Sequence, residues 1–152
     1  MNADDDEAIA FITDRTTQTT YTLEESSSAH ISVHEALQWR WSIAEHFAKS
    51  VDKIKYGIQS IYLFGTVFNN SASANSDIDM LVISDNIELT RGEFFTWLDG
   101  WNQALSQVNF HKYGIHINKM IDLHIVSSEE ISDKIYFMEI IDPKNNQSIK
   151  LL

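Results

Sequence analysis

The spacing of the apolar residues alternates along the chain between a helical pattern and an extended one. Two stripes recur at steps of four and three residues, which places their side chains on one face of a helix. The first stripe comprises Leu37, Trp41, Ala44, Ala48 and Val51, and the second comprises Phe94, Leu98, Trp101, Leu105 and Val108. Short apolar runs at 61–64 and 78–83 are typical of buried strands. This alternation predicts an α/β domain in which helices flank a small mixed sheet.

Turn and cap residues predict where these elements begin and end. Pairs with capping-box spacing predict three helix starts, namely Ser32 with Glu35, Thr90 with Glu93, and Ser127 with Glu130. Gly57 is expected to end the first helix, and the second is expected over 91–108. The last helix should end before Pro143, because a proline disfavours helical geometry at the preceding residue. A third extended segment is expected over 115–126, with an interruption near Lys119.

Length, cysteine content and charge limit the classes of function. The 152 residues suffice for one domain, expected over 31–152, after an acidic and polar arm at 1–30. The chain has no cysteine, which excludes disulfides and thiolate metal sites. No signal-peptide pattern or bilayer-length apolar run is present, so we expect a cytoplasmic protein that does not enter a membrane. The formal net charge of -11 disfavours nucleic acid as a partner and suits a divalent cation or a basic protein.

Two carboxylates stand close together at the start of the second predicted strand. Asp77 and Asp79 are two residues apart, so both side chains are expected on one face. Such a pair is repulsive unless it is solvated, hydrogen-bonded or neutralised by cations. Magnesium takes oxygen ligands of this kind, and two ions about 4 Å apart can hold the attacking and leaving oxygens of a phosphoryl displacement. By itself, however, the spacing is more often that of a solvated acidic pair.

Asp122 is a third carboxylate, in the later extended segment. There it alternates with Ile121, Leu123 and Ile125. An unpaired buried carboxylate is costly, so a metal ion shared with Asp77 is one explanation of its position. A strand with one solvated face is the other explanation, and the pattern alone leaves both open.

Gly65 and Thr66 directly follow the first predicted strand. A glycine there permits close backbone approach, and free N–H groups at a following turn or helix start can bind phosphate. The Thr66 hydroxyl adds a further donor. A glycine that merely ends a strand is the commoner case when it is seen alone.

In this order, the motifs resemble those of the polymerase-beta-like nucleotidyltransferase superfamily, and especially its minimal, antitoxin-type members. The family pattern is a strand ending in Gly-Ser, a loop, Ser-Asp-x-Asp before an apolar strand, and a later strand with a third aspartate. Here Gly65-Thr66, the segment Ser76-Asp77-Ile78-Asp79, and Asp122 occupy these positions. The resemblance covers about 35–140 and implies a nucleotidyltransferase fold.

Two positions depart from the family pattern. The family's serine is Thr66 here, which keeps the hydroxyl. Minimal members often have Arg-Gly inside the loop, where this chain has Asn69-Asn70. Asn70 is able to adopt the left-handed conformation that glycine would supply. Asn69 stands where the family has an arginine that would contact phosphate, and this difference affects the expected activity and substrate choice.

The resemblance implies an enzyme that moves a nucleoside monophosphate from a nucleoside triphosphate, ATP being expected, to a hydroxyl group. The implied catalytic and metal-binding residues, for two Mg²⁺ ions, are Asp77, Asp79 and Asp122. The implied phosphate-binding residues are Gly65, Thr66 and Ser76. The acceptor would belong to a partner protein, such as a toxin-like protein, or to a small molecule, and a partner or a homo-oligomer would complete the site. The alternative is a noncatalytic module that binds a nucleotide or a partner protein.

Several other residues are candidates for the site. His124 shares a face with Asp122 and lies within reach of the same metal or substrate, although a surface histidine is the commoner case. Arg91 and Lys119 are candidates for a triphosphate contact and are more simply explained as solvated charges. The residues without a metal-ligand or base-stacking pattern are His111, His116, Trp39 and Trp41.

Overall fold

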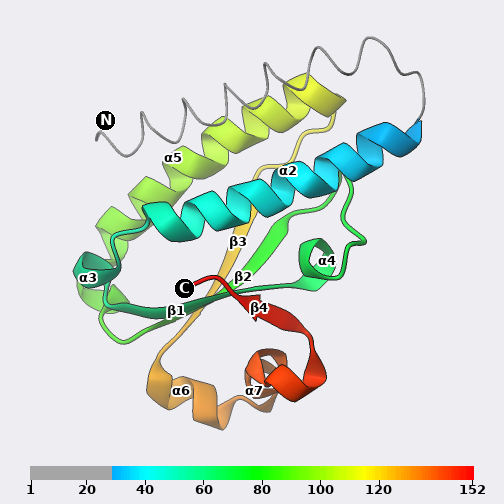
Figure 1. Cartoon of the computed structure of the whole chain (residues 1–152). Coiled ribbons are helices and arrows are strands. Elements are labelled where there is room, and N and C mark those ends of the chain that lie inside the picture. The colour runs from blue at the N-terminus through cyan, green and yellow to red at the C-terminus, as the bar shows by residue number, and fades with distance from the viewer. Residues whose placement is uncertain (1–28) are drawn as a thin grey trace.

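The helices and strands of the computed structural model follow one another in the predicted alternation (Figure 1). The structure describes residues 29–152, with side chains from residue 33 onward. The helices are α2 (Ala29–Ser50), α3 (Lys53–Tyr56), α4 (Gly65–Phe68), α5 (Ile87–Tyr113), α6 (Ser128–Asp133) and α7 (Ile135–Ile141), followed by a 3-10 turn, η1 (Pro143–Asn145). The strands are β1 (Ile58–Phe64), β2 (Ile78–Ser84), β3 (Ile121–Val126) and β4 (Ser148–Lys150). Among the described residues, none of the helices combines the length and the apolar content that crossing a bilayer requires.

The four strands form one mixed sheet with the order β3-β2-β1-β4. β1 pairs antiparallel with both β2 and β4, whereas β2 pairs parallel with β3. The parallel pair is joined through α5, since parallel neighbours need a long crossover connection. The predicted class, an α/β domain with a small mixed sheet flanked by helices, is confirmed.

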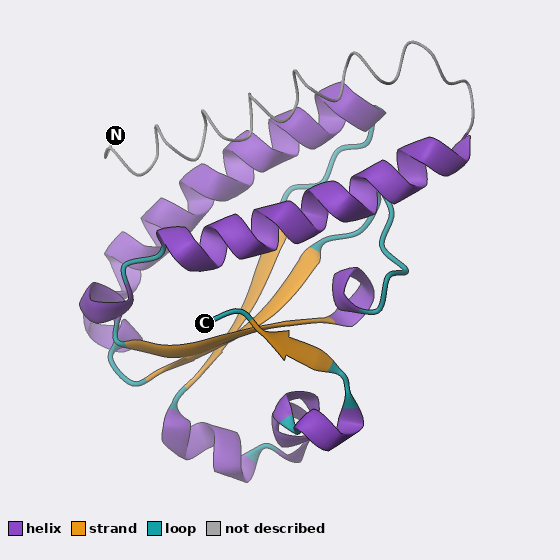
Figure 2. Ribbon diagram, viewed as in Figure 1, coloured by secondary structure: helices purple, strands orange, loops and turns teal. Residues whose placement is uncertain are grey.

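One face of the sheet is covered by the two long helices, α2 and α5 (Figure 2). This helical face contains the main core, in which aromatic rings from both helices meet. Phe47 packs against Trp97 and Trp101, with ring centroids 5.2 and 5.5 Å apart. From the sheet, alternate strand residues such as Ile61 and Met80 enter the same core and are fully buried. The burial of these large apolar side chains is the main stabilising contribution to the fold.

The opposite face of the sheet carries a second, smaller core beneath α6 and α7. We call this side of the sheet the open face. Its fully enclosed members are Phe64, Leu81, Ile83, Val126, Ile131 and Ile140. Leu81 and Ile83 lie on the same face of β2 as Asp79, because side chains two residues apart point the same way. The acidic residues of the strands therefore share the open face with this core.

The predicted helix starts are only partly correct. α2 begins at Ala29, so Ser32 lies inside the helix and does not mark its start. Residues 1–28, most of the predicted arm, lie outside the described residues. α5 spans Ile87–Tyr113, but Thr90 is non-helical, with φ -121 and ψ 16, so the long part of the helix begins at residue 91 as predicted and a short turn from Ile87 precedes it. The cap at Ser127 is confirmed, because its side chain accepts a bond from the Glu130 N–H at 3.0 Å.

The predicted ends of the helices also needed correction. Gly57 does cap a helix, with φ 63, but that helix is the short α3, which a break after Ser50 separates from α2. The last helix is two helices, which Lys134 separates in an extended conformation, and α7 ends before Pro143 as predicted. Only 121–126 of the third extended segment forms a strand. β4 is an additional strand that the sequence pattern did not predict.

Candidate metal centre

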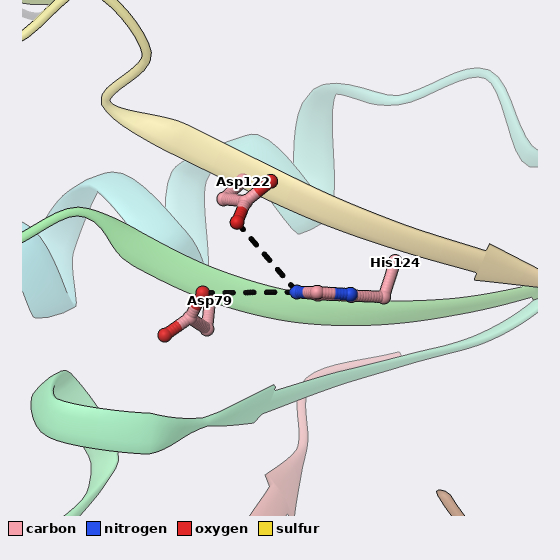
Figure 3. Close-up of side chains that lie close together, drawn as sticks. All are labelled: Asp79, Asp122 and His124. Atoms are coloured by element: carbon pink, nitrogen blue, oxygen red, sulfur yellow. Dashed lines mark ion pairs between the residues drawn. The ribbon is translucent and has the colours of Figure 1, made fainter.

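Asp79 and Asp122 face each other across the parallel pair β2 and β3. The two residues are direct partners in the register of the strands. His124, two residues further along β3, directs its Nε2 atom toward both carboxylates (Figure 3). The Nε2 atom lies 3.8 Å from Asp79 Oδ1 and 3.6 Å from Asp122 Oδ2. One ligand atom from each of the three residues lies within 4.8 Å of the others, a spacing suited to a common metal ion.

Gly65 lies directly against the Asp79 carboxylate. A Cβ atom at this position would stand 2.7 Å from Asp79 Oδ2, closer than any real contact of that kind. The residue also has a φ of 75, which side-chain-bearing residues adopt at a cost. Both facts favour glycine here, so Gly65 does more than end a strand. It brings the first turn of α4 next to the carboxylate of β2.

Asp77 does not join the group of three. β2 begins at Ile78, so Asp77 belongs to the preceding loop and not to the strand. Its charge nevertheless acts at the site, since it helps to raise the pKa of Asp79. The structure thus brings Asp79 and Asp122 together as predicted, places Asp77 in their neighbourhood, and adds His124 to the group.

Arg40 is a fully buried residue of α2 that holds this loop in place. Its Nε donates to the Ser76 carbonyl at 2.8 Å, and its NH2 group donates to the Ala74 carbonyl at 3.1 Å and to Asn109 Oδ1 at 2.8 Å. Burial lowers the pKa of Arg40 to about 10, while the charges of Tyr113 and Asp77 oppose that shift. The guanidinium therefore fixes the backbone immediately before Asp77.

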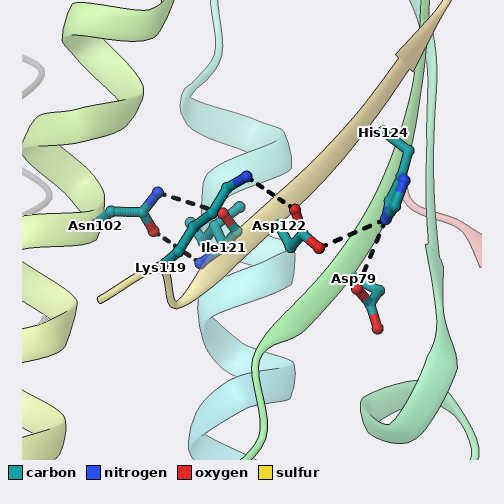
Figure 4. A network of polar contacts seen from close by, with 6 residues as sticks. All are labelled: Asp79, Asn102, Lys119, Ile121, Asp122 and His124. Atoms are coloured by element: carbon teal, nitrogen blue, oxygen red, sulfur yellow. Dashed lines mark hydrogen bonds and ion pairs between the residues drawn. The ribbon is translucent and has the colours of Figure 1, made fainter. Parts of the chain in front are cut away.

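Asn102 of α5 anchors the start of β3 in a similar way (Figure 4). Its side-chain amide accepts from the Ile121 N–H at 2.7 Å and donates to the Ile121 carbonyl at 3.3 Å. At the solvent side, Lys119 Nζ lies 3.1 Å from Asp122 Oδ1. Asn102 thus fixes the backbone beside Asp122, and the Lys119 ammonium group contacts the Asp122 carboxylate.

The sequence pattern did not predict roles for Arg40, Asn102 and Asn109. Their only signal was a polar residue within or beside an apolar helical stripe.

The surroundings of Asp79 disfavour its charged form. Partial burial is the largest cause that raises the pKa of its carboxyl, followed by the charges of Asp77 and Asp122, while His124 acts in the opposite direction. The exposed fractions of the side chains are 24% for Asp79, 29% for Asp122 and 39% for His124, so an ion from solvent can reach them. The carboxyl atoms and the imidazole nitrogen fit a cation in their donor chemistry as well as in their spacing.

The residues predicted to bind phosphate lie at the two ends of the loop between β1 and β2. Thr66 is exposed in the first turn of α4, where backbone N–H groups have no partner within the helix. The Ser76 hydroxyl instead accepts a bond from the Ser73 N–H at 2.9 Å, which stabilises the loop. Asn70 has a φ of 64, the predicted left-handed conformation, and Asn69 Oδ1 accepts from the Ser71 N–H at 3.1 Å.

The remaining candidates do not contribute to this site. Arg91 is exposed and pairs with Glu88 at 2.9 Å. His116 is exposed and contacts Asn118. Trp39 is buried in the main core, and Trp41 packs against Phe68 with centroids 6.5 Å apart. Trp39 is thus a core residue, and Trp41 is partly buried against the same core. His111 is likewise exposed and is not among the three grouped ligand residues of the described chain.

Lys119 also lines a groove beside the acidic group, between α5 and the segment before β3. The groove has a volume of about 400 Å³. Its lining combines apolar, amide and charged side chains, namely Phe95, Leu98, Asp99, Asn102, Gln103, Asn118 and Lys119.

Comparison of the chain with protein-family models, with curated proteins and with solved structures found no match. Functional inference therefore depends on the chemistry of the site itself.

Proposed function

We propose that this chain is a metal-dependent nucleotidyltransferase, which moves a nucleoside monophosphate from a triphosphate to a hydroxyl of a protein or a small molecule. The observation that carries the proposal is the pairing of Asp79 with Asp122 across parallel strands, with Gly65 in contact with the Asp79 carboxylate. This arrangement places two oxygen-ligand side chains beside the exposed turn at Thr66. It is the constellation that the resemblance to the polymerase-beta-like superfamily implies.

The side chains present fit this chemistry. In the reaction, the acceptor oxygen forms a bond to the α-phosphorus, the bond from that phosphorus to its bridging oxygen breaks, and pyrophosphate leaves. Asp77, Asp79 and Asp122 would hold two Mg²⁺ ions, which when bound neutralise the triphosphate and the charge that develops at phosphorus. Asp122 would take the hydroxyl proton, and its contact with Lys119 keeps its carboxylate in place for that task. Backbone N–H groups at Gly65 and Thr66 would bind the terminal phosphates.

A transfer assay with two differently labelled nucleotides tests the proposal. The chain is incubated with Mg²⁺ and a cell extract or candidate acceptor, in parallel with α-labelled and γ-labelled ATP. Label is expected on an acceptor from α-labelled ATP only, because pyrophosphate carries the γ-phosphate away. Asp122→Asn should abolish transfer, whereas Asp99→Asn, an exposed carboxylate on α5, should not. Transfer from γ-labelled ATP that requires the added chain, or no chain-dependent transfer from α-labelled ATP, would contradict the proposal.

A noncatalytic partner-binding module is the second candidate, and the surface around α7 favours it. Large apolar side chains lie exposed there, with 75% of Ile135, 64% of Tyr136, 44% of Met138 and, on β4, 42% of Ile149 accessible. A groove of about 580 Å³ runs beside Ile135 and Met138. Under this candidate, Ile135→Asp would abolish partner binding and Asp122→Asn would not. ATP would then bind without being turned over, or would not bind.

A further inference from the structure

The spacing of Asp79, Asp122 and His124 is too wide for direct hydrogen bonds and narrow enough for a shared ion. The imidazole Nε2 atom lies 3.6 and 3.8 Å from the two carboxylate oxygens, whereas hydrogen bonds to oxygen are about 2.7–3.2 Å long. A tetrahedral centre with bonds of about 2.0–2.1 Å would need its ligand atoms about 3.3–3.5 Å apart. The imidazole Nε2 therefore needs to approach each carboxylate by only a few tenths of an ångström, and all three ligand atoms already lie within 4.8 Å of one another.

Packing directs the imidazole into this group. The His124 ring packs against two aromatic rings, that of Phe64 from β1 and that of Phe137 from α7, with centroids 5.5 and 6.0 Å away. These neighbours limit the rotation of the ring and aim its Nε2 atom at the carboxylates. At Asp122, Lys119 contacts Oδ1, which leaves Oδ2 to face the imidazole. Each of the three side chains thus presents one definite ligand atom (Figure 3).

We propose that Asp79, Asp122 and His124 bind a single divalent transition-metal ion, from Mn²⁺ to Zn²⁺, through two carboxylate oxygens and the imidazole Nε2. The presence of a nitrogen ligand decides the class of ion. Magnesium is bound almost entirely by oxygen, whereas imidazole favours the ions of the first transition row. This site is therefore not the oxygen-only centre that Asp77, Asp79 and Asp122 would form.

The transition-metal site is tested separately from the transferase, although they share two residues. The readout is metal binding by the chain alone, without nucleotide or acceptor. Failure of the transfer assay leaves this proposal standing, and failure of metal binding at His124 leaves a Mg²⁺-dependent transferase standing. The competing explanation is that His124 is a positively charged partner of the two carboxylates, in which case a metal would have to displace it.

Titration calorimetry on tag-free, metal-stripped protein is the decisive experiment. ZnCl₂, MnCl₂ and MgCl₂ are titrated separately into the wild-type chain. One Zn²⁺ and one Mn²⁺ are expected to bind, each at least about tenfold more tightly than Mg²⁺. His124→Ala should weaken Zn²⁺ and Mn²⁺ at least about tenfold, which is the lower end of the loss seen even for outer residues of metal sites. His124→Asp, which restores an oxygen-only set, should narrow the gap between Zn²⁺ and Mg²⁺.

Two controls separate this site from general attraction of cations to an acidic protein. His116→Ala removes an exposed histidine, and Asp99→Asn removes an exposed carboxylate, and both should leave Zn²⁺ binding unchanged. Mn²⁺ paramagnetic resonance of wild type and His124→Ala gives a second readout, because nitrogen coordination alters the signal of the bound ion. Circular dichroism confirms that each variant is folded.

Three outcomes would overturn the proposal. The first is that His124→Ala binds Zn²⁺ as tightly as wild type, so that the imidazole is not a ligand. The second is that Mg²⁺ binds as tightly as Zn²⁺ and Mn²⁺. The third is that the control variants lose as much affinity as His124→Ala, which would indicate binding spread over the surface.

Discussion

The two faces of the sheet are built by different means. The helical face is covered along its length by α2 and α5, and its core includes fully buried rings such as Phe47 and Phe94. Among residues 29–152, the open face is covered only by α6 and α7, and its core is far smaller. Asp79, Asp122 and His124 occupy the part of the open face that these short helices leave accessible (Figures 1 and 3).

This difference shows how a polar site can be kept both exposed and well ordered. The side chains of the site need access to solvent, so apolar packing alone does not hold them. Their backbone is instead fixed by hydrogen bonds from the helical face. Arg40 of α2 binds the main chain next to Asp77, and Asn102 of α5 binds the main chain next to Asp122. The helical face thus contributes stability and position, and the open face contributes chemistry.

Truncating one phenylalanine on each face should give the largest difference in unfolding free energy between the two faces. Phe47→Ala is expected to cost about 3–5 kcal/mol, because the ring is fully buried and leaves a cavity among tryptophans. Phe137 is only partly buried against the smaller core of the open face, so Phe137→Ala should cost about 1–2 kcal/mol. Urea unfolding measures both free energies. Equal costs would mean that the open face stabilises the fold as strongly as the helical one.

Arg40→Met tests whether the helical face positions the loop before Asp77. We expect a loss of about 2–3 kcal/mol, because the carbonyls of Ala74 and Ser76 lose a charged donor in a buried place. Hydrogen exchange should show loss of protection in 73–77. Arg91→Met, at an exposed ion pair, is the control and should change stability by less than about 0.5 kcal/mol. Unchanged exchange in the loop would show that Arg40 is not its anchor.

Gly65→Ala tests the contact between the turn of α4 and the open face. The variant should lose about 1–2 kcal/mol from the positive φ alone, and its new methyl group must also displace the Asp79 carboxylate. Gly114→Ala is a matched control, because φ there is 70 and no atom lies within 4 Å of the added Cβ. Both variants should lose stability in thermal unfolding, and only Gly65→Ala should also lose metal affinity. Equal metal affinity in the two would show that Asp79 tolerates the displacement.

The sequence predicted the helical face better than the open one. The second apolar stripe is accurate, since Phe94, Leu98, Trp101 and Leu105 are all buried. The first stripe is shifted, because the fully buried residues of α2 include Ile43 and Phe47 beside the predicted Ala44 and Ala48. Periodicity identifies a long amphipathic helix reliably. It does not determine which of two neighbouring stripes is buried, because such stripes are offset by a single residue.

What sequence reasoning missed depends on tertiary contacts. β4 has three residues, and it forms because β1 offers an antiparallel edge to pair with. Arg40 is an unusual core residue, whose burial is explained by acceptors distant in sequence, namely the carbonyls of the loop before Asp77 and Asn109 Oδ1. At the site, the Asp-x-Asp spacing favoured Asp77, but β2 begins one residue later, at Ile78, and the parallel register pairs Asp79 with Asp122. The third member of the group is His124, which alternation along the strand had placed on the face of Asp122. Spacing along a chain does not fix the register between strands.

Asp79→Asn should produce the smallest change in stability, and it should raise the stability, whereas the other variants lower it. The pKa of Asp79 is raised in the folded protein, so the folded state binds more protons than the unfolded state between the two pKa values. Stability is therefore lost as pH rises through that window, and the loss is complete above it. In metal-free protein at pH 7 the variant should be more stable by about 1 kcal/mol, the size of a like-charge repulsion at about 4 Å in water.

The gain from Asp79→Asn should shrink toward zero as the pH falls below the ordinary aspartate value of 3.8, because the wild-type carboxyl is then increasingly protonated in both states. Thermal unfolding from pH 3.5 to 7 measures the difference, which for a domain of this size is about 3 °C at neutral pH. Zn²⁺ should reverse the order at pH 7, because only the wild-type chain retains the full set of ligands and binding stabilises the folded state. A variant less stable than wild type at pH 7 without metal would mean that His124 already neutralises Asp79. The open face would then be a closed ion-pair network, and not a site prepared for a cation.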